Sequence, residues 1–124
     1  MSEKYLLPSP KEILNSQGSK KYKHEKTPWT LYASSKRVLK DWRNLVINNP
    51  DETIACYKAM SNDPMNRIRG VAFAMKGKIF KGGWEYRVNK SDRVFYKPIK
   101  DTKEVIVYYA DKHPRENKYP TPPS

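Results

Sequence analysis

The stretch WEYRVNKSDRVFY, residues 84–96, has the pattern of a β-hairpin and decides the fold of the chain. Aromatic or apolar residues alternate with charged ones on both sides of a polar turn, which is typical of two antiparallel strands. Residues two apart on a strand share a face, so Glu85 and Arg87 point away from the aromatic side chains between and beside them. Arg93 begins the returning strand. We therefore expect one aromatic face in the core and one charged face.

The hairpin belongs to a run of three strands. A third alternating segment follows it, and short polar turns join the three, which predicts an antiparallel meander. The expected strands are residues 84–89, 93–97 and 104–110. Pro98 lacks a backbone N–H, so the second of these strands should end, bulge or lie at an edge near it.

Two helices and one strand are expected before the meander. WTLYA, residues 29–33, alternates and is short enough for a first strand. Ser34 or Ser35 can cap a helix whose apolar residues follow at helical spacing as far as the NNP at residues 48–50. A second helix should start at Pro50 and end near Ala59. The order strand, helix, helix, three strands predicts an α+β fold, with both helices on one face of a small, mostly antiparallel, twisted sheet.

One domain is expected in 124 residues. Residues 1–26 are rich in Lys, Ser and Pro, and we expect them to form a basic, flexible extension with one short helix at residues 11–16. Residues 27–119 form the expected domain. Residues 120–124 form a proline-rich tail, which cannot pair its backbone regularly.

The net charge of +12 points to a polyanionic partner, nucleic acid first, and it is concentrated in one segment. Residues 64–100 contain ten Lys or Arg and two Asp or Glu, which gives +8 of the total. Cys56 is the single cysteine, so neither an intrachain disulfide nor a multi-cysteine metal site can form. The apolar run before Pro8 is too short for a signal-peptide core, and no segment is apolar enough to span a membrane. We expect a cytoplasmic protein that needs no metal or cofactor.

The charged face suggests metal-free RNA cleavage. In that reaction the 2′-hydroxyl of the RNA attacks the adjacent phosphate, and the protein must move two protons and stabilise negative charge at phosphorus. A histidine side chain can transfer protons near neutral pH, and His113 follows the last strand; Arg87 and Arg93 can bind phosphate oxygens. By themselves the two arginines could equally be solvated strand residues, and a lone histidine is more often structural.

A resemblance to a known family supports this interpretation. MKGKIFKGGWEYRVNKSDRVFYKPIKDTKEVIVYYADKHP, residues 75–114, resembles the C-terminal half of the RelE/ParE superfamily of toxin–antitoxin toxins, and is most similar to ribosome-dependent mRNA interferases of the RelE and YoeB type. The preceding WTLYASSKRVLKDWRNLVINNPDETIACYKAMSNDP resembles the strand and helical hairpin of that family. The resemblance covers residues 27–119 and leaves residues 1–26 unexplained.

The resemblance implies roles for single residues. Lys76 matches a loop lysine, Arg87 a basic strand residue, and Arg93 an arginine that engages the scissile phosphate. His113 stands where YoeB-type members have a general-acid histidine, and Tyr119 stands at the spacing of a tyrosine that stacks on a base. Glu85 replaces a catalytic lysine, so it is either the general base or an ion-pair partner that orients the arginines. The remaining candidate RNA-binding residues are Lys78, Lys81 and Lys112.

The family also implies partners: mRNA, the ribosome at the decoding site of its 16S rRNA, and a cognate antitoxin protein. Two other functions fit the sequence. One is inhibition of DNA gyrase, as in ParE-like toxins of the same fold, which needs no acid–base residues. The other is a non-catalytic basic module that binds RNA or the ribosome through backbone contacts. The combination of His113 with Arg87 and Arg93 favours cleavage.

Overall fold

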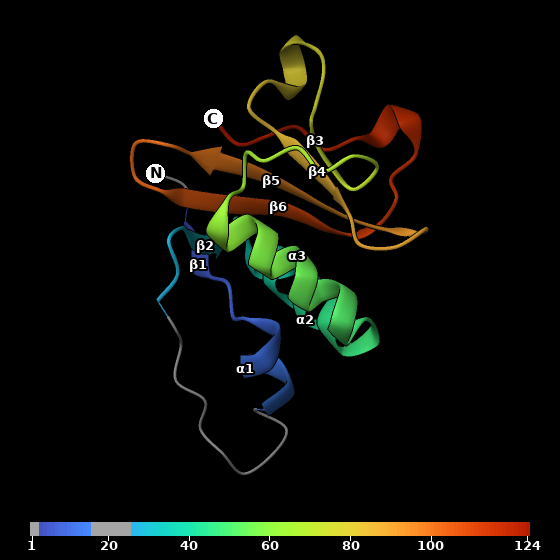
Figure 1. Cartoon of the computed structure of the whole chain (residues 1–124). Coiled ribbons are helices and arrows are strands. Elements are labelled where there is room, and N and C mark those ends of the chain that lie inside the picture. Colours follow the sequence, from blue (N-terminus) through green and yellow to red (C-terminus); the bar gives the residue numbers. More distant parts are fainter. Residues whose placement is uncertain (1–2, 16–25) are drawn as a thin grey trace.

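The computed structural model describes residues 3–15 and 26–124, which form helices on one face of a mixed sheet (Figure 1). The six strands are ordered β1-β2-β6-β5-β4-β3, and only the β2–β6 pair is parallel. Their bounds are β1 Tyr5–Leu6, β2 Thr30–Ala33, β3 Ala72–Ala74, β4 Trp84–Arg87, β5 Asp92–Ile99 and β6 Glu104–Lys112. The helices are α1 Pro10–Asn15, α2 Lys36–Asn48 and α3 Pro50–Asn62. The α+β fold and the antiparallel β4-β5-β6 meander are thus confirmed.

Local chemistry explains the helix pair. The side chain of Ser35 accepts a hydrogen bond from the backbone N–H of Val38 and caps α2, and Pro50 stands in the first turn of α3. The apolar side of α2 packs on the sheet through Trp42 and Val46, both 0% exposed. Only Asn49 separates the two helices, so α3 returns beside α2 on the same face of the sheet (Figure 1). The second helix runs three residues further than expected, to Asn62.

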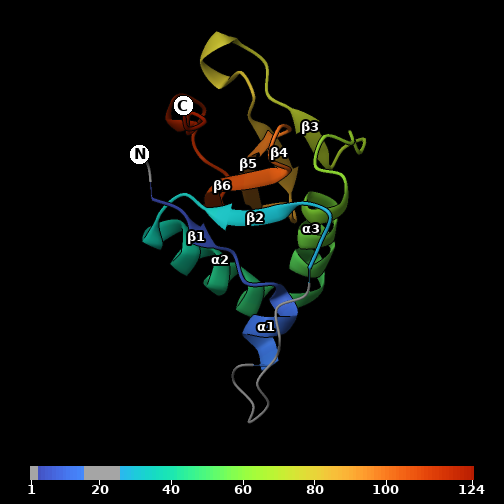
Figure 2. The ribbon, with the colours of Figure 1, turned by 90° about the vertical axis from the view of Figure 1, so that its left-hand side faces the viewer.

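The described part of the N-terminal segment is not the free extension that its composition predicted. Strand β1 pairs antiparallel with β2, and α1 lies under α2 and α3 (Figure 2). Leu7 is 0% exposed and Ile13 3% exposed, both within the main core. Ser9 and Glu12 bond reciprocally to each other's backbone N–H, forming a capping box that starts α1. The rest of the predicted extension, residues 1–2 and 16–25, lies outside the described residues.

The opposite face of the sheet is covered by the end of the chain. Phe95, Ile106 and Tyr108 are buried there, outside the core that the helices cover. The register between β5 and β6 shifts next to Phe95, so that Phe95 lies opposite two residues of β6, 108 and 109. Beyond β6 the chain makes one 3₁₀ turn, Glu116–Lys118, and returns over this face, where the backbone oxygen of Pro123 accepts a hydrogen bond from Lys97 Nζ at 2.8 Å. The expected tail is irregular in conformation and packs on the sheet.

Candidate functional site

The β4–β5 pairing sets the charged face of the hairpin. Arg87 pairs directly with Arg93 across the two strands, and Glu85 pairs with Phe95. Opposed residues of antiparallel strands share a face, so Glu85 lies on the same side as both arginines, as the alternation predicted. Strand β3 adds Phe73 opposite Glu85 from the other edge of β4.

Glu85 is the centre of an ion-pair cluster. Its side chain is buried, and its Oε2 lies 3.4 Å from Nε of Arg93 and 3.8 Å from Nε of Arg87. The two guanidinium groups differ in exposure: the Arg93 side chain is 10% exposed and that of Arg87 48% exposed. The Arg87 guanidinium lies over the ring of Phe73, 5.3 Å from its centroid. The cluster therefore presents Arg87 to solvent and keeps Arg93 inside.

His113 and Tyr119 meet at the end of β6. The hydroxyl of Tyr119 and Nε2 of His113 are 2.9 Å apart, and the backbone N–H of His113 donates to the backbone oxygen of Ser91 at 2.7 Å. The Tyr119 ring packs edge-on against Phe95 and Phe80, which fixes it over the sheet. Burial, followed by the negative charge of Glu85, raises the pKa of the Tyr119 hydroxyl. The hydroxyl is therefore protonated at neutral pH and can share its proton with the imidazole.

These groups border one cavity of about 600 Å³. Five of the nine predicted site residues line it: Lys76, Glu85, Arg87, His113 and Tyr119. Phe73, Ala74 and Met75 supply an apolar side, and Arg67 completes the rim. A cavity with a cationic rim, an apolar side and a titratable imidazole has the composition expected for a phosphate group attached to a flat base.

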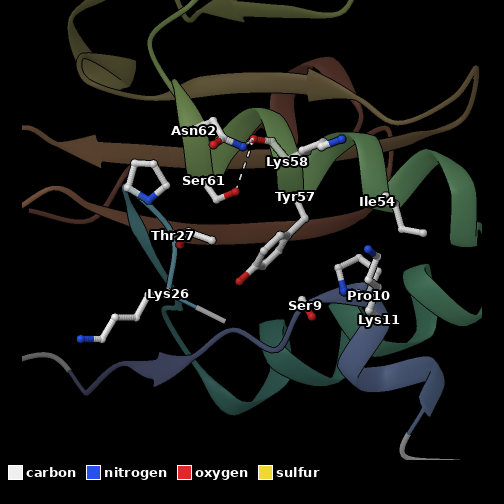
Figure 3. A pocket seen from close by; sticks show the side chains of 11 residues that line it. Ser9, Pro10, Lys11, Lys26, Thr27, Ile54, Tyr57, Lys58, Ser61 and Asn62 are labelled. Atoms are coloured by element: carbon white, nitrogen blue, oxygen red, sulfur yellow. Dashed lines mark hydrogen bonds between the residues drawn. The ribbon is translucent and has the colours of Figure 1, made fainter. Parts of the chain in front are cut away.

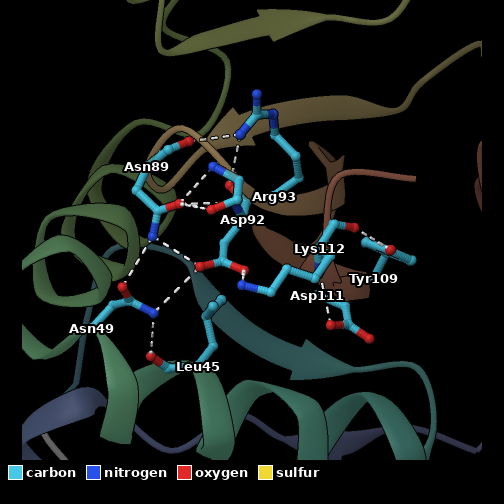
Figure 4. Close-up of polar contacts among 9 residues, drawn as sticks. Leu45, Asn49, Asn89, Asp92, Arg93, Tyr109, Asp111 and Lys112 are labelled. Atoms are coloured by element: carbon cyan, nitrogen blue, oxygen red, sulfur yellow. Dashed lines mark hydrogen bonds and ion pairs between the residues drawn. The ribbon is translucent and has the colours of Figure 1, made fainter. Parts of the chain in front are cut away.

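The other four predicted residues lie outside this cavity. The buried Arg93 side chain pairs with Glu85 on the side of Glu85 that is away from the cavity. Lys78 and Lys81 are exposed in the loop of the 3₁₀ turn Lys78–Phe80. Lys112 extends to the other side of the hairpin, where its Nζ is 3.2 Å from Oδ1 of Asp92 (Figure 4). Its ammonium group thus belongs to a separate, amide-rich hollow of about 360 Å³.

Arg67 is the site residue that the sequence analysis missed. It lies in the connection between α3 and β3, and its position beside the cavity depends on the path of that irregular segment. Within the described residues, neither Arg67 nor Lys76 has an ion pair, so both charges are available to a ligand. The available signal was the absence of Asp and Glu from residues 64–84.

A third hollow, of about 310 Å³, lies between α3 and the N-terminal segment (Figure 3). Lys11, Lys26 and Lys58 border it together with Tyr57 and Ile54. It contains none of the predicted site residues.

Two general features of the described chain bear on the chemistry. Among residues 3–15 and 26–124, no three His, Cys, Asp or Glu side chains are grouped so that they could hold a metal ion. No helix in the same residues is long and apolar enough to cross a membrane.

Comparison with known proteins identifies the fold. No family model matches the chain, and no curated protein matches it in sequence. Two solved structures from Staphylococcus aureus, a YoeB–YefM complex and a heterotetrameric complex of the YoeB–YefM toxin–antitoxin, each contain a similar chain. In both, the TM-score is 0.50, the identity is 14%, and the similarity covers 69% of this chain and 98% of the other. The chain thus has a fold that resembles YoeB.

Proposed function

We propose that the protein is the toxin of a type II toxin–antitoxin system and an endoribonuclease that cuts mRNA on the ribosome, in the cytoplasm. The observation that carries this proposal is the single cavity bordered by Lys76, Arg87, His113 and Tyr119. Residues from four separate parts of the chain converge on it, and their side chains supply the two things that RNA cleavage requires, positive charge and a titratable group. The YoeB-like fold supports the assignment to this class of toxin.

Cleavage would use the 2′-hydroxyl of the message as nucleophile and would need no metal. The 2′-oxygen loses its proton to solvent water and bonds to phosphorus, the bond from phosphorus to the 5′-oxygen breaks as that oxygen takes up a proton, and the products are a 2′,3′-cyclic phosphate and a 5′-hydroxyl. Arg87, Lys76 and Arg67 would bind the phosphate oxygens as negative charge builds up on them, because each has a cationic group at the cavity.

His113 would act as the general acid. Its imidazolium would give a proton to the departing 5′-oxygen, and the Tyr119 hydroxyl, 2.9 Å from Nε2, would orient the ring. The Tyr119 ring packs against Phe80 and Phe95. A base could therefore stack only on the part of the ring that faces the cavity.

Glu85 and Arg93 would act together behind the phosphate. Both are buried, and each is the ion-pair partner of the other, so we assign Glu85 to holding Arg87 and Arg93 rather than to taking the 2′-hydroxyl proton. Arg93 would contribute its positive charge from below the surface and not through direct contact with phosphate.

Further contacts would bind the ribosome. Lys78 and Lys81 project from an exposed loop that is free of carboxylates, which suits the phosphate backbone of 16S rRNA near the decoding site. Lys112 is paired with Asp92, so we expect it to contribute less to ribosome binding than Lys78 and Lys81. A cognate antitoxin would cover the cationic cavity, since the similar YoeB chains are in complexes with YefM.

A translating extract tests the proposal. Addition of the wild-type protein should cut message that is bound to ribosomes, and His113→Ala should abolish the cuts while its circular dichroism stays that of the wild type. Lys40→Ala is the matched control, because Lys40 is exposed on α2 and does not border the cavity, and it should cut normally. Intact message in the presence of wild-type protein would contradict the proposal.

The other two functions are separate outcomes of the same experiment. Intact message together with blocked DNA supercoiling by gyrase would indicate a ParE-like inhibitor. Intact message together with co-sedimentation of the protein with ribosomes would indicate the non-catalytic binding module.

A further inference from the structure

The turn between β4 and β5 is held by the side chain of its first residue. Asn89 Oδ1 accepts hydrogen bonds from the backbone N–H groups of Ser91 and Asp92, each at 2.8 Å. A side-chain oxygen that bonds the backbone two residues on fixes the turn locally. The backbone N–H of Val88 closes it by donating to the oxygen of Asp92 at 3.1 Å.

A second asparagine ties this turn to the helices. Asn89 Nδ2 donates to Oδ1 of Asn49 at 2.9 Å and to Oδ2 of Asp92 at 2.8 Å (Figure 4). Asn49 is the residue between α2 and α3, and its own Nδ2 donates to the backbone oxygen of Leu45 at 3.2 Å. The amide of Asn89 thus joins the helix junction to the hairpin across 40 residues of sequence.

The backbone oxygens of the same turn hold two residues of the proposed site. Nη1 of Arg93 donates to the oxygens of Asn89 and Asp92 at 2.6 and 3.0 Å. The oxygen of Ser91 accepts the backbone N–H of His113 at 2.7 Å. All three acceptors are backbone oxygens, so the shape of the turn helps to decide where the guanidinium and the histidine backbone lie.

We propose that Asn89, anchored by Asn49, is the positioning residue of the site: it fixes the turn from which Arg93 and His113 are held at the same time. The proposal rests on the proposed function for its effect on catalysis, and on the contacts above for its effect on structure. The position of Arg93 also affects that of Arg87, because Nε of Arg93 faces Glu85 and Glu85 in turn faces Nε of Arg87.

The expected effect is on the reaction step and not on binding. Asn89 and Asn49 are outside the cavity, so their loss leaves Lys76, Arg67 and the loop lysines in place to bind RNA. A shift of the turn by about 1 Å would displace His113 and Arg93 together, and a misplacement of that size can lower the rate by as much as about 100-fold.

The test compares Asn89→Ala and Asn49→Ala with Asn44→Ala. Asn44 borders the same hollow and, within the described residues, makes no side-chain hydrogen bond to the turn. With message-loaded ribosomes as substrate, the first two variants should lower kcat by about 10- to 100-fold and leave KM within about twofold, and the control should match wild type. Unchanged kcat in Asn89→Ala would overturn the proposal.

Exchanging the amide of Asn89 with the carboxylate of Asp92 tests whether kcat can be rescued. Asn89→Asp keeps the oxygen that accepts from Ser91 and Asp92 but puts a second oxygen opposite Oδ2 of Asp92 and Oδ1 of Asn49, so kcat should fall. Adding Asp92→Asn restores a donor between positions 89 and 92 but not the bond to Asn49, so kcat should recover in part. Failure of the pair to recover, with the fold intact by circular dichroism, would count against the proposal. If Asn89→Ala does not fold, this pair and Asn49→Ala decide the outcome.

A measurement without activity separates this inference from the proposed function. Hydrogen exchange of the His113 backbone amide and the NMR shift of the Arg93 Nε–H group should both change in Asn49→Ala and Asn89→Ala, and neither should change in Asn44→Ala. If wild-type protein cuts no message but these signals change as expected, the proposed function fails and the positioning role stands. If the signals of all three variants match wild type, the positioning role fails, whatever the activity.

Discussion

Glu85 shows how one buried carboxylate organises the charged face. An ionised group that is only 3% exposed is costly unless it is paired, and here its Oε2 faces the Nε atoms of Arg87 and Arg93. The alternation of the hairpin predicted that these three residues share a face. It could not predict that Arg93 is inside and Arg87 outside, because that depends on the turn that accepts the Arg93 guanidinium.

Glu85→Gln should lower the free energy of unfolding by about 3 kcal/mol, because it leaves the buried Arg93 guanidinium without its anion. Urea denaturation measures this. Glu116→Gln, at an exposed carboxylate, is the control and should change the same quantity by less than about 0.5 kcal/mol. Equal stability of the two variants would contradict the ion-pair role.

Tyr108 and Tyr96 make a second matched pair. The hydroxyl of Tyr108 is buried and has no hydrogen-bond partner among the residues that the structure describes, whereas that of Tyr96 donates to the backbone oxygen of Pro64 at 2.9 Å. Tyr96→Phe should therefore cost about 0.5 to 1.5 kcal/mol of unfolding free energy. Tyr108→Phe should cost nothing or stabilise, since it removes an unsatisfied buried group. Thermal melts of both variants check this, and a larger loss in Tyr108→Phe would contradict it.

At the scale of elements, the sequence predicted what periodicity can reveal. Helices α2 and α3 and strands β4, β5 and β6 carry regular apolar patterns, and all five are present close to the expected bounds. The short helix expected at residues 11–16 is α1, Pro10–Asn15, whereas β1 has only two residues, too few to show a period. Their structure comes from tertiary contacts: pairing with β2, and a hydrogen bond from the Trp42 indole to the backbone oxygen of Pro8 at 2.8 Å. The place of Arg67 beside the cavity likewise depends on tertiary structure, namely the path of the irregular segment between α3 and β3.

Leu7→Ala should lower the free energy of unfolding by about 2 to 5 kcal/mol, because it opens a cavity in the core where Leu7 is 0% exposed. The neighbouring Leu6 is 48% exposed, so Leu6→Ala should cost less than about 0.5 kcal/mol. Denaturant titration of the two variants compares them directly. Similar small losses in both would mean that the N-terminal segment is the loose extension that its composition predicted.

At the scale of the whole molecule, the two ends of the chain pack on the central domain and add residues to its core and to the cavity. The N-terminal segment covers one side of the helices, and the C-terminal segment returns over the other face of the sheet and brings Tyr119 to His113 (Figure 1). The segment with +8 of the net charge lies between them and supplies Arg67, Lys76 and Arg87 to the cavity. The charge distribution thus predicted which part of the chain supplies the cationic groups of the cavity.

The stability of the whole fold should depend on alkaline pH through its buried tyrosines. Burial raises the pKa of Tyr86 to about 12 and that of Tyr96 further. An unfolded tyrosine ionises near pKa 10, as in model peptides. Folded tyrosines keep protons that the unfolded chain releases, so their contribution is complete below about pH 10 and is lost as the pH rises toward about 12.

Urea denaturation at increasing pH should show this loss, and Tyr86→Phe should show a smaller decline over the same range. The comparison removes the effect of lysines, which titrate in both proteins. An identical decline in wild type and Tyr86→Phe would mean that Tyr86 does not contribute.

The central claim is that the cavity promotes attack by the RNA's own 2′-hydroxyl, and one measurement tests it most directly. The cut position is mapped first in a message of ordinary ribose, and a second message is then made with a single 2′-deoxynucleotide immediately 5′ of that cut. Wild-type protein in a translating extract should leave the modified bond intact while it still cuts other sites. Cleavage of the modified bond at the normal rate would contradict the account.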